Sequence, residues 1–336
     1  MHEFHAGLLL LQQCLANTPG VKTTVHRNGW PEAPDAFAGA DAVVLYCDGG
    51  DKHPAIQADR REILRALAQK GVGLGFMHYG VEVPATLEHL DGVEYATTLR
   101  RDGASVGTVE HLLSALYAIG VDDVRVEVDG PEVPILDGSA APFLFLIECA
   151  GVLTSAVPRQ MIEVLRPIRV EDAQGAFAEL RPNSEAALDA VLDIDYPNTA
   201  IGHQSLTFRL TPDAFRTILA DARTFGLAED VERLRQAGLA LGGSLANAVV
   251  VDGPNILNPG GLRHPDEFVR HKMLDMVGDL ALAGAPLRAR FTGSRSGHAL
   301  NNQLLRALFA DSTAWRMVGE VAAPEAARAL RAKQKA

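Results

Sequence analysis

The chain contains 336 residues, of which 47% are hydrophobic and 22% are charged, and its formal net charge is −11. This is globular composition with enough apolar material for a core, and the length suggests two or three domains. The acidic balance argues against a general nucleic-acid binder, because phosphate contacts need clustered Lys and Arg. Three scattered cysteines and no apolar run of about 20 residues predict neither a disulfide framework nor an integral membrane segment. We expect a cytoplasmic enzyme or small-molecule binder, and composition makes no prediction of its oligomeric state.

Two apolar stretches near the N-terminus predict neighbouring strands of one sheet. Residues 42–46 form a continuous apolar run of strand length, closed by Asp48-Gly49-Gly50. A helix is expected over residues 60–70 and a second buried strand over 71–77. The order strand, helix, strand with fully apolar strands is typical of a doubly wound parallel sheet. This pattern ends at Val83-Pro84.

Beyond Pro84 the predicted elements follow a different order. A helix is expected over residues 109–119, with Thr108 as its N-cap, and a strand over 124–128. A second helix follows near residues 142–150. A new unit begins near Val157, and its expected elements are strands at 160–164, 168–171 and 187–194 and helices at 212–222 and 265–282.

The stretch 267–279 contains four polar side chains, His271, Lys272, Asp275 and Asp279, whose helical spacing is informative. Each helical residue advances by about 100°, so His271 and Asp275 lie about 40° apart on one face. An imidazole and a carboxylate placed in this way suit a zinc ion. Lys272 and Asp279 project within about 20° of each other on a neighbouring stripe. The alternative interpretation is a solvated charged face with an ordinary His–Asp surface pair.

A second group stands where the helix at 109–119 begins. Glu110 and His111 are adjacent and lead into apolar residues that will be buried. Burial of these two side chains is costly unless they have partners. A metal would be a partner for His111 and would leave Glu110 as a general base for water. The alternative is that Glu110 only stabilises the N-terminus of the helix.

A third group is a loop histidine, His298, which follows glycine-containing residues 292–297 and begins a helix. Histidine titrates near neutrality, so a histidine in this position is a candidate acid. The alternative is a helix cap or an ordinary surface residue. Each of the three groups is a weak indication by itself.

Together they resemble one family, the UDP-3-O-acyl-N-acetylglucosamine deacetylases (LpxC), zinc amidases of lipid A synthesis. The resemblance covers about residues 95–322. Its matching runs, in the order of the family, are TVEHLLSAL at 108–116, DGPEVPILDGSAAPF at 129–143, ARTFG at 222–226, LGGS at 241–244, FVRHKMLD at 268–275 and GHALNN at 297–302.

The resemblance implies a role for each matching residue. His111, His271 and Asp275 would be the ligands of Zn²⁺, with the fourth position open. Glu110 would take a proton from water as it attacks the N-acetyl carbonyl. The products would be acetate and the free amine of the sugar.

The other implied roles concern charge and substrate. Thr224 and Lys272 would stabilise the oxyanion together with zinc. His298, held by Asp279, would protonate the departing amine, and the carboxylate would raise its pKa. The substrate-binding residues for the UDP-acyl-sugar would be Lys272 and two residues that help to form the acyl-chain passage, Phe225 and Leu227. For Phe225 and Leu227 the alternative is ordinary core packing.

The N-terminal segment resembles a different family. Residues 2–84 are similar to a fragment of the ThuA-like, glutamine-amidotransferase-like fold. The similarity rests on residues 2–7, 28–31, 48–50, 53–54 and 78–84. A complete first deacetylase domain would begin well before Thr108, and that stretch is missing from the matching runs. A half-sheet exposes its edges unless something pairs with it.

We therefore predict an α/β (α+β) protein with two deacetylase-type domains, each a sheet stacked on helices. Residues 1–86 would form a partial flavodoxin-like segment, 87–156 a truncated first deacetylase domain, 157–322 a second one and 323–336 a tail. The leading hypothesis is zinc-dependent deacetylation. The alternatives are a catalytically impaired fusion that binds UDP-sugar or carbohydrate without turnover, and an N-terminal segment that serves as a carbohydrate-binding or interaction module.

Overall fold

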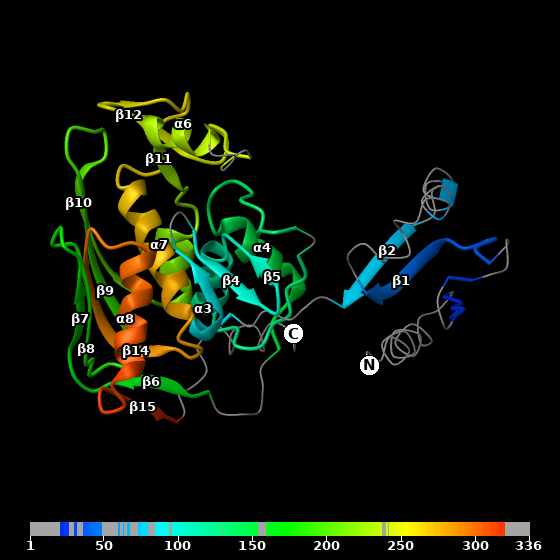
Figure 1. Ribbon diagram of the computed structural model, residues 1–336, viewed down its shortest axis with the longest axis horizontal. Helices are drawn as coiled ribbons and strands as arrows, with labels where there is room; N and C mark the ends of the chain where they lie inside the picture. Colours follow the sequence, from blue (N-terminus) through cyan, green and yellow to red (C-terminus); the bar gives the residue numbers. More distant parts are fainter. Residues whose placement is uncertain are drawn as a thin grey trace, which may run out of the picture. The chain divides into compact units, whose positions relative to one another are not determined.

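The chain divides into two compact units, Met1–Glu82 and Val83–Ala336 (Figure 1). The computed structural model describes residues 21–26, 30–31, 36–48, 60, 63, 66–67, 73–79, 85–93, 96–128, 130–153, 159–236, 240 and 242–319. Within these ranges, no helix combines the length and the apolar character needed to cross a bilayer.

The first unit contains a pair of parallel strands, β1 (Ala42–Asp48) and β2 (Gly73–Tyr79). Their register runs from Ala42 opposite Gly73 to Asp48 opposite Tyr79. This confirms the prediction of two neighbouring parallel strands from apolar runs. The helix expected over residues 60–70 lies mostly outside the described residues, and the likeness to a flavodoxin-like or ThuA-like fold stays a prediction.

The second unit begins with a short 3₁₀ helix, Leu87–His89, which a small antiparallel sheet follows. The strands of this sheet are β3 (Leu90–Gly92), β4 (Thr98–Arg101) and β5 (Ala104–Val106), and β4 pairs with both neighbours. Two helices follow, α3 (Glu110–Ile119) and α4 (Ala141–Ala150). Both were expected from the sequence.

The strand expected over residues 124–128 is wrong. The segment has no regular structure, and Val124 and Val126 are about half exposed. Alternating valines form a strand only when a neighbouring strand supplies the other half of the hydrogen-bond ladder. The described part of the chain places no strand beside this segment.

A seven-stranded mixed sheet forms the largest layer. The order β10-β9-β14-β6-β15 runs through its centre, and β8 pairs with β14 and with β7. β14 is parallel to β9 and β6 and antiparallel to β8. The strands are β6 (Met161–Val164), β7 (Ile168–Glu171), β8 (Phe177–Arg181), β9 (Leu188–Tyr196), β10 (Gly202–Arg209), β14 (Leu287–Ser294) and β15 (Trp315–Val318).

Several short elements lie between β10 and α7 in the sequence. The helix expected over 212–222 begins as α5 (Pro212–Ala214) and continues as a turn of π-helix, Phe215–Leu219. A three-stranded sheet and a short helix follow, with the elements β11 (Phe225–Leu227), α6 (Ala228–Gln236), β12 (Val249–Asp252) and β13 (Asn255–Ile256).

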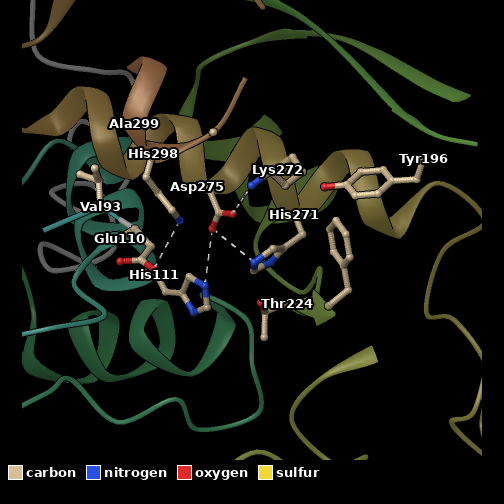
Figure 2. Close-up of a pocket in the computed structure, with 12 residues that line it drawn as sticks. Val93, Glu110, His111, Tyr196, Thr224, His271, Lys272, Asp275, His298 and Ala299 are labelled. Atoms are coloured by element: carbon tan, nitrogen blue, oxygen red, sulfur yellow. Dashed lines mark hydrogen bonds and ion pairs between the residues drawn. The ribbon is translucent and has the colours of Figure 1, made fainter. Parts of the chain in front are cut away.

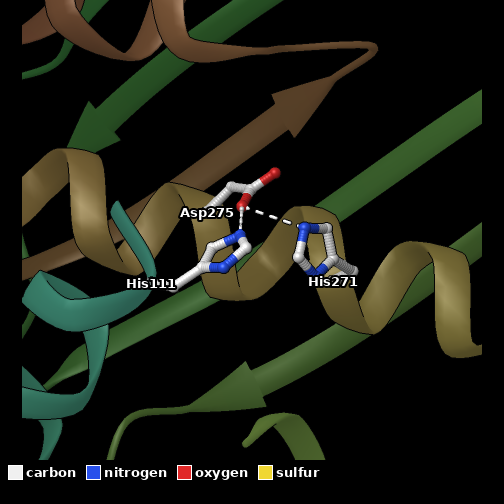
Figure 3. Close-up of side chains that lie close together, drawn as sticks. All are labelled: His111, His271 and Asp275. Atoms are coloured by element: carbon white, nitrogen blue, oxygen red, sulfur yellow. Dashed lines mark ion pairs between the residues drawn. The ribbon is translucent and has the colours of Figure 1, made fainter. Parts of the chain in front are cut away.

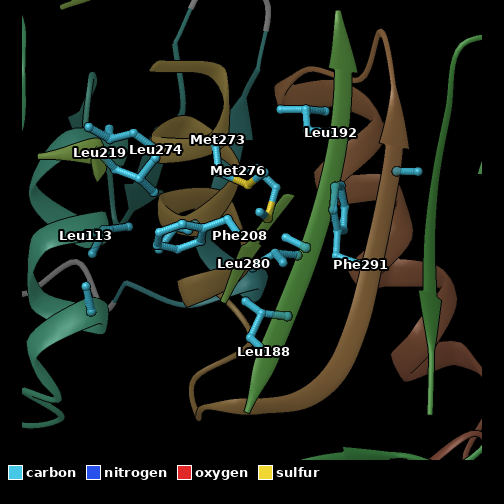
Figure 4. Packing of buried hydrophobic residues seen from close by; sticks show 14 of the residues in the cluster. Leu113, Leu188, Leu192, Phe208, Leu219, Met273, Leu274, Met276, Leu280 and Phe291 are labelled. Carbon is cyan, nitrogen blue, oxygen red and sulfur yellow. The ribbon is translucent and has the colours of Figure 1, made fainter. Parts of the chain in front are cut away.

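The central helix α7 (Glu267–Ala281) packs on α3 with one face and on β9 and β10 with another, and α8 (His298–Ala310) packs beside it (Figure 1). Met276 and Leu280 of α7 meet Leu192 and Phe291 of the large sheet in a fully buried core (Figure 4). Because α7 is covered on most sides, four of its polar side chains are buried, namely Glu267, His271, Asp275 and Asp279, whereas Arg270 and Lys272 are partly buried. The polar groups of the site are therefore held in a rigid, mostly apolar setting.

Candidate metal centre

The N-terminus of α3 delivers two polar side chains to the centre of the second unit. The helix begins at Glu110, and Val109, with helical backbone angles, occupies the N-cap position. The prediction of Thr108 as N-cap is wrong, because Thr108 takes a left-handed backbone conformation with a φ of 56°. Its hydroxyl instead donates to Glu132 Oε2 over 3.3 Å. Glu110 and His111 thus enter the core at the first turn of α3.

Three side chains converge where α3 meets α7 (Figure 3). His271 Nε2 lies 3.2 Å and His111 Nε2 3.6 Å from Asp275 Oδ1. The two imidazole rings are nearly perpendicular, with their centroids 4.9 Å apart. All three residues are at most 5% exposed. This burial rules out the solvated charged face as an interpretation of His271 and Asp275.

The donor set fits a metal ion. Among the described residues, Asp275 Oδ1 and His111 Nδ1 are buried side-chain atoms without a hydrogen-bond partner. His271 Nδ1 is 3.0 Å from the carbonyl oxygen of Ala222, to which it donates, so that Nε2 is the nitrogen left to bind a metal as the neutral imidazole. One ligand atom from each of His111, His271 and Asp275 lies within 4.8 Å of the others. A cation there would satisfy the unpaired carboxylate oxygen.

The electrostatic setting keeps the carboxylate ionised and Lys272 charged. Burial opposes ionisation of Asp275, but His271 and Lys272 outweigh it and hold its pKa well below the usual value. Burial likewise lowers the pKa of Lys272, and the charge of Asp275 more than compensates, so that its pKa is raised. Lys272 Nζ lies 3.5 Å from Asp275 Oδ2. The site therefore places an ionised carboxylate beside a charged ammonium group.

Glu110 and His298 lie close together beside the three candidate metal ligands. His298 Nε2 lies 3.8 Å from Glu110 Oε1, and His298 Nδ1 lies 2.9 Å from Asp279 Oδ2. Burial raises the pKa of Glu110, an effect that His298 and His111 only partly offset. Burial lowers the pKa of His298, but the charge and hydrogen bond of Asp279 outweigh it and raise that pKa to about 9. The carboxylate is thus a stronger base than usual, and the imidazole remains protonated at neutral pH.

These groups line one cavity of about 340 Å³ (Figure 2). Eight of the residues proposed from the sequence are at its wall, namely Glu110, His111, Thr224, Phe225, His271, Lys272, Asp275 and His298. Asp279 is fully buried behind His298 and reaches the cavity only through that imidazole. Leu227 belongs to β11 with Phe225 but is not among the lining residues.

Sequence reasoning missed Tyr196, which lines this cavity, and Glu267, which lies behind its wall. Tyr196, at the end of β9, lines it and packs its ring against Phe225 with centroids 5.8 Å apart. Glu267, one turn before His271, is fully buried and pairs with Arg223 Nε over 2.8 Å. Spacing offered a signal for Glu267, which precedes His271 by the same four residues that separate His271 from Asp275. No comparable signal marked Tyr196.

A buried pair of histidines and a carboxylate, next to a buried glutamate and an imidazole–carboxylate pair, defines the class of metal-dependent hydrolases. The family model of UDP-3-O-acyl N-acetylglycosamine deacetylase (LpxC) matches residues 61–310. The chain belongs to this family.

Curated relatives agree with the family model. A UDP-3-O-acyl-N-acetylglucosamine deacetylase of Myxococcus xanthus (strain DK1622) is 46% identical over 238 residues, 71% of this chain and 75% of the relative. Its namesake in Shewanella sp. (strain ANA-3) is 44% identical over 243 residues, 72% of this chain and 79% of the relative. The UDP-3-O-acyl-N-acetylglucosamine deacetylase of Shewanella baltica (strain OS195) is 45% identical over 239 residues, which are 71% of this chain and 78% of the relative.

Proposed function

We propose that the protein hydrolyses the N-acetyl group of UDP-3-O-acyl-N-acetylglucosamine to the free amine and acetate, as a zinc enzyme of lipid A synthesis. The observation that carries the proposal is the convergence of His111, His271 and Asp275 beside Glu110 in one cavity. The names of the relatives supply the substrate. A cytoplasmic location, expected from the sequence, is part of this proposal.

Zinc is the metal that we propose for this site. Two imidazole nitrogens and one carboxylate oxygen form a ligand set typical of catalytic zinc, which keeps one position free for water or substrate. When bound there, zinc supplies a Lewis acid that makes water more acidic and a carbonyl group more electrophilic. His111, His271 and Asp275 would hold it.

The side chains around the ligands would carry the proton transfers. Glu110, whose pKa burial raises, would take a proton from the attacking water. Thr224 and Lys272 would hydrogen-bond the oxygen on which negative charge develops. His298, kept protonated by Asp279, would deliver a proton to the nitrogen as the C–N bond breaks, so that the amine leaves neutral.

Substrate binding and domain organisation complete the proposal. Phe225 at the cavity wall, with Leu227 farther along β11, would guide the acyl chain, and Lys272 would contact the substrate.

The proposed domains are residues 1–86, 87–156 and 157–322, with a tail over residues 323–336. The truncated first domain would still supply Glu110 and His111 through α3.

The test is acetate release from UDP-3-O-acyl-N-acetylglucosamine by the purified full-length chain. We expect turnover that a chelator abolishes and added zinc restores. His271→Ala should reduce turnover by at least about 100-fold, because a catalytic zinc ligand is lost. His203→Ala, which removes an exposed imidazole from β10, should leave turnover unchanged. Substrate binding without acetate release at full zinc occupancy would contradict the proposal and would identify an impaired binding protein.

A further inference from the structure

Thr97 connects the glutamate on one helix to the aspartate on another. It lies immediately before β4 and is fully buried. Its backbone N–H donates to Glu110 Oε2 over 3.0 Å, and its hydroxyl donates to Asp279 Oδ1 over 2.7 Å. One residue thus holds a carboxylate with its main chain and a second carboxylate with its side chain.

The hydroxyl also lies next to the imidazole that would act as the acid. Thr97 Oγ1 is 3.4 Å from His298 Nδ1, the nitrogen that bonds Asp279. Asp279 Oδ2 accepts a further hydrogen bond from Asn301 Nδ2 over 2.9 Å. With Thr97 on Oδ1, Asn301 on Oδ2 and His298 facing both oxygens, the carboxylate of Asp279 is held in one orientation.

The position of Thr97 is itself fixed by α3. Its carbonyl oxygen accepts a hydrogen bond from the backbone N–H of Val109 over 3.3 Å, so that residue 97 is anchored to the start of the helix that carries Glu110. Glu110 lies on α3, Asp279 on α7 and His298 on α8. Thr97 therefore connects groups from three helices through direct hydrogen bonds or close contact.

We propose that Thr97 is a positioning residue that fixes the separation between the base Glu110 and the acid His298. This inference rests on the proposed function, in which the two groups must serve one reacting amide at the same time. The separation between Glu110 Oε1 and His298 Nε2 is 3.8 Å. Proton transfer is sensitive to small changes in such a separation, since a misplacement of about 1 Å can cost about 100-fold in rate.

The two contacts of Thr97 can be separated by substitution. Thr97→Val keeps the shape of the side chain and the backbone N–H to Glu110 but removes the hydroxyl that donates to Asp279. The carboxylate of Asp279 would then lose the hydrogen bond that fixes Oδ1 and keep the one from Asn301 on Oδ2, so the Asp279–His298 pair would be held less firmly, while the cavity, the proposed metal ligands and the substrate-binding residues stay in place. Thr97→Ser restores a hydroxyl that can donate to Asp279.

The experiment compares these variants in acetate release from UDP-3-O-acyl-N-acetylglucosamine at full zinc occupancy. For Thr97→Val we expect kcat to fall by about 10- to 100-fold, with KM and zinc content close to wild type. For Thr97→Ser we expect kcat to return to within a few-fold of wild type. Thr98→Val, a matched control, removes a hydroxyl from the next residue, which is partly exposed and does not line the cavity. Its kinetics should be those of wild type.

Two kinds of result would overturn the inference, and they can be distinguished. An active wild-type enzyme combined with a Thr97→Val variant that keeps at least half of its kcat would refute the role of Thr97 and leave the proposed function standing. A Thr97→Ser variant as impaired as Thr97→Val would refute that role in the same way. A zinc-loaded wild type that releases no acetate would refute the proposed function and the inference with it. If Thr97→Val fails to fold, Thr97→Ala removes the same hydroxyl and carries the same expectations.

Discussion

Gly278 of α7 lies directly against the backbone of Glu110 in α3, so closely that a Cβ atom at position 278 would overlap the carbonyl oxygen of Glu110. A residue without a side chain is thus required where the two helices cross. The close crossing brings His111, the next residue of α3, beside Asp275, one turn earlier on α7. The geometry of the candidate metal centre therefore depends on a glycine that is not one of its proposed ligands.

Gly278→Ala is expected to separate α3 from α7 and to weaken metal binding. The added methyl group meets backbone atoms, which cannot rotate away, so the helices must move apart. Overpacking of this kind typically costs about 1–3 kcal/mol of stability. We expect zinc affinity, measured by competition with a chromophoric chelator, to fall by at least about 10-fold, in the range seen when the support of a ligand is disturbed.

The matched control for this prediction is Gly260→Ala, since a Cβ atom at position 260 would meet nothing within 4 Å. That variant should bind zinc as wild type does. Equal zinc affinity of Gly278→Ala and wild type would show that the crossing tolerates a methyl group and that the glycine does not set the ligand distances.

The protonation of His298 gives a prediction that can be tested without metal. Its pKa is raised to about 9, because Asp279 outweighs the effect of burial, with Asp275 and Glu110 adding to it. The stability that the folded protein gains from the protonated imidazole of His298 is fully present below the ordinary histidine pKa of about 6.5. It is lost as the pH rises through about 9. NMR titration of the metal-free protein should show this pKa, and Asp279→Asn should lower it, since burial is then opposed less. An unchanged pKa in Asp279→Asn would contradict the assignment.

Metal removal is expected to destabilise the folded chain. Without a cation the buried Asp275 Oδ1 has no hydrogen-bond partner, and a ligand that binds only the folded state stabilises it by about 2.7 kcal/mol at a concentration of 100 Kd. Chelated protein should therefore melt at a lower temperature than zinc-loaded protein. His271→Ala should lose most of this zinc-dependent difference, whereas His203→Ala should keep it.

Much of this site was predictable because its residues form patterns along single helices. His271 and Asp275 are one turn apart on α7, so helical geometry alone predicted that their side chains share a face. Glu110 and His111 stood out because polar residues led into an apolar helix. What brought these pairs together was the resemblance to a family, since periodicity does not reveal which helices cross.

The parts that sequence reasoning missed depend on contacts between distant segments. Thr97 lies in a segment with no regular pattern, and its two partners are 13 and 182 residues away. Gly278 carries no sequence signal for its role, because the approach of α3 cannot be read from α7 alone. The strand expected at 124–128 failed for a related reason, since alternation predicts a strand but does not supply its partner.

Glu267 provides the last prediction, because it supports His271 from one turn away. Its carboxylate accepts hydrogen bonds from the side chain and backbone N–H of Arg223. Arg223 follows Ala222, whose carbonyl oxygen holds His271 Nδ1. Glu267→Gln breaks a buried ion pair, which typically costs about 3–5 kcal/mol. We also expect zinc affinity to fall by about 10-fold, because the imidazole loses its fixed orientation.

Urea unfolding and zinc competition would measure these two effects of Glu267→Gln. Burial raises the pKa of Glu267, but the hydrogen bonds from Arg223 and Arg263 outweigh it and lower the pKa overall. The stability from this pair is therefore present above the ordinary glutamate pKa and lost as the pH falls through the lowered one, and the variant should lack this acid-dependent loss. Glu148→Gln, which breaks an exposed pair with Arg216, should cost less than about 1 kcal/mol. Similar losses in both variants would contradict the supporting role of Glu267.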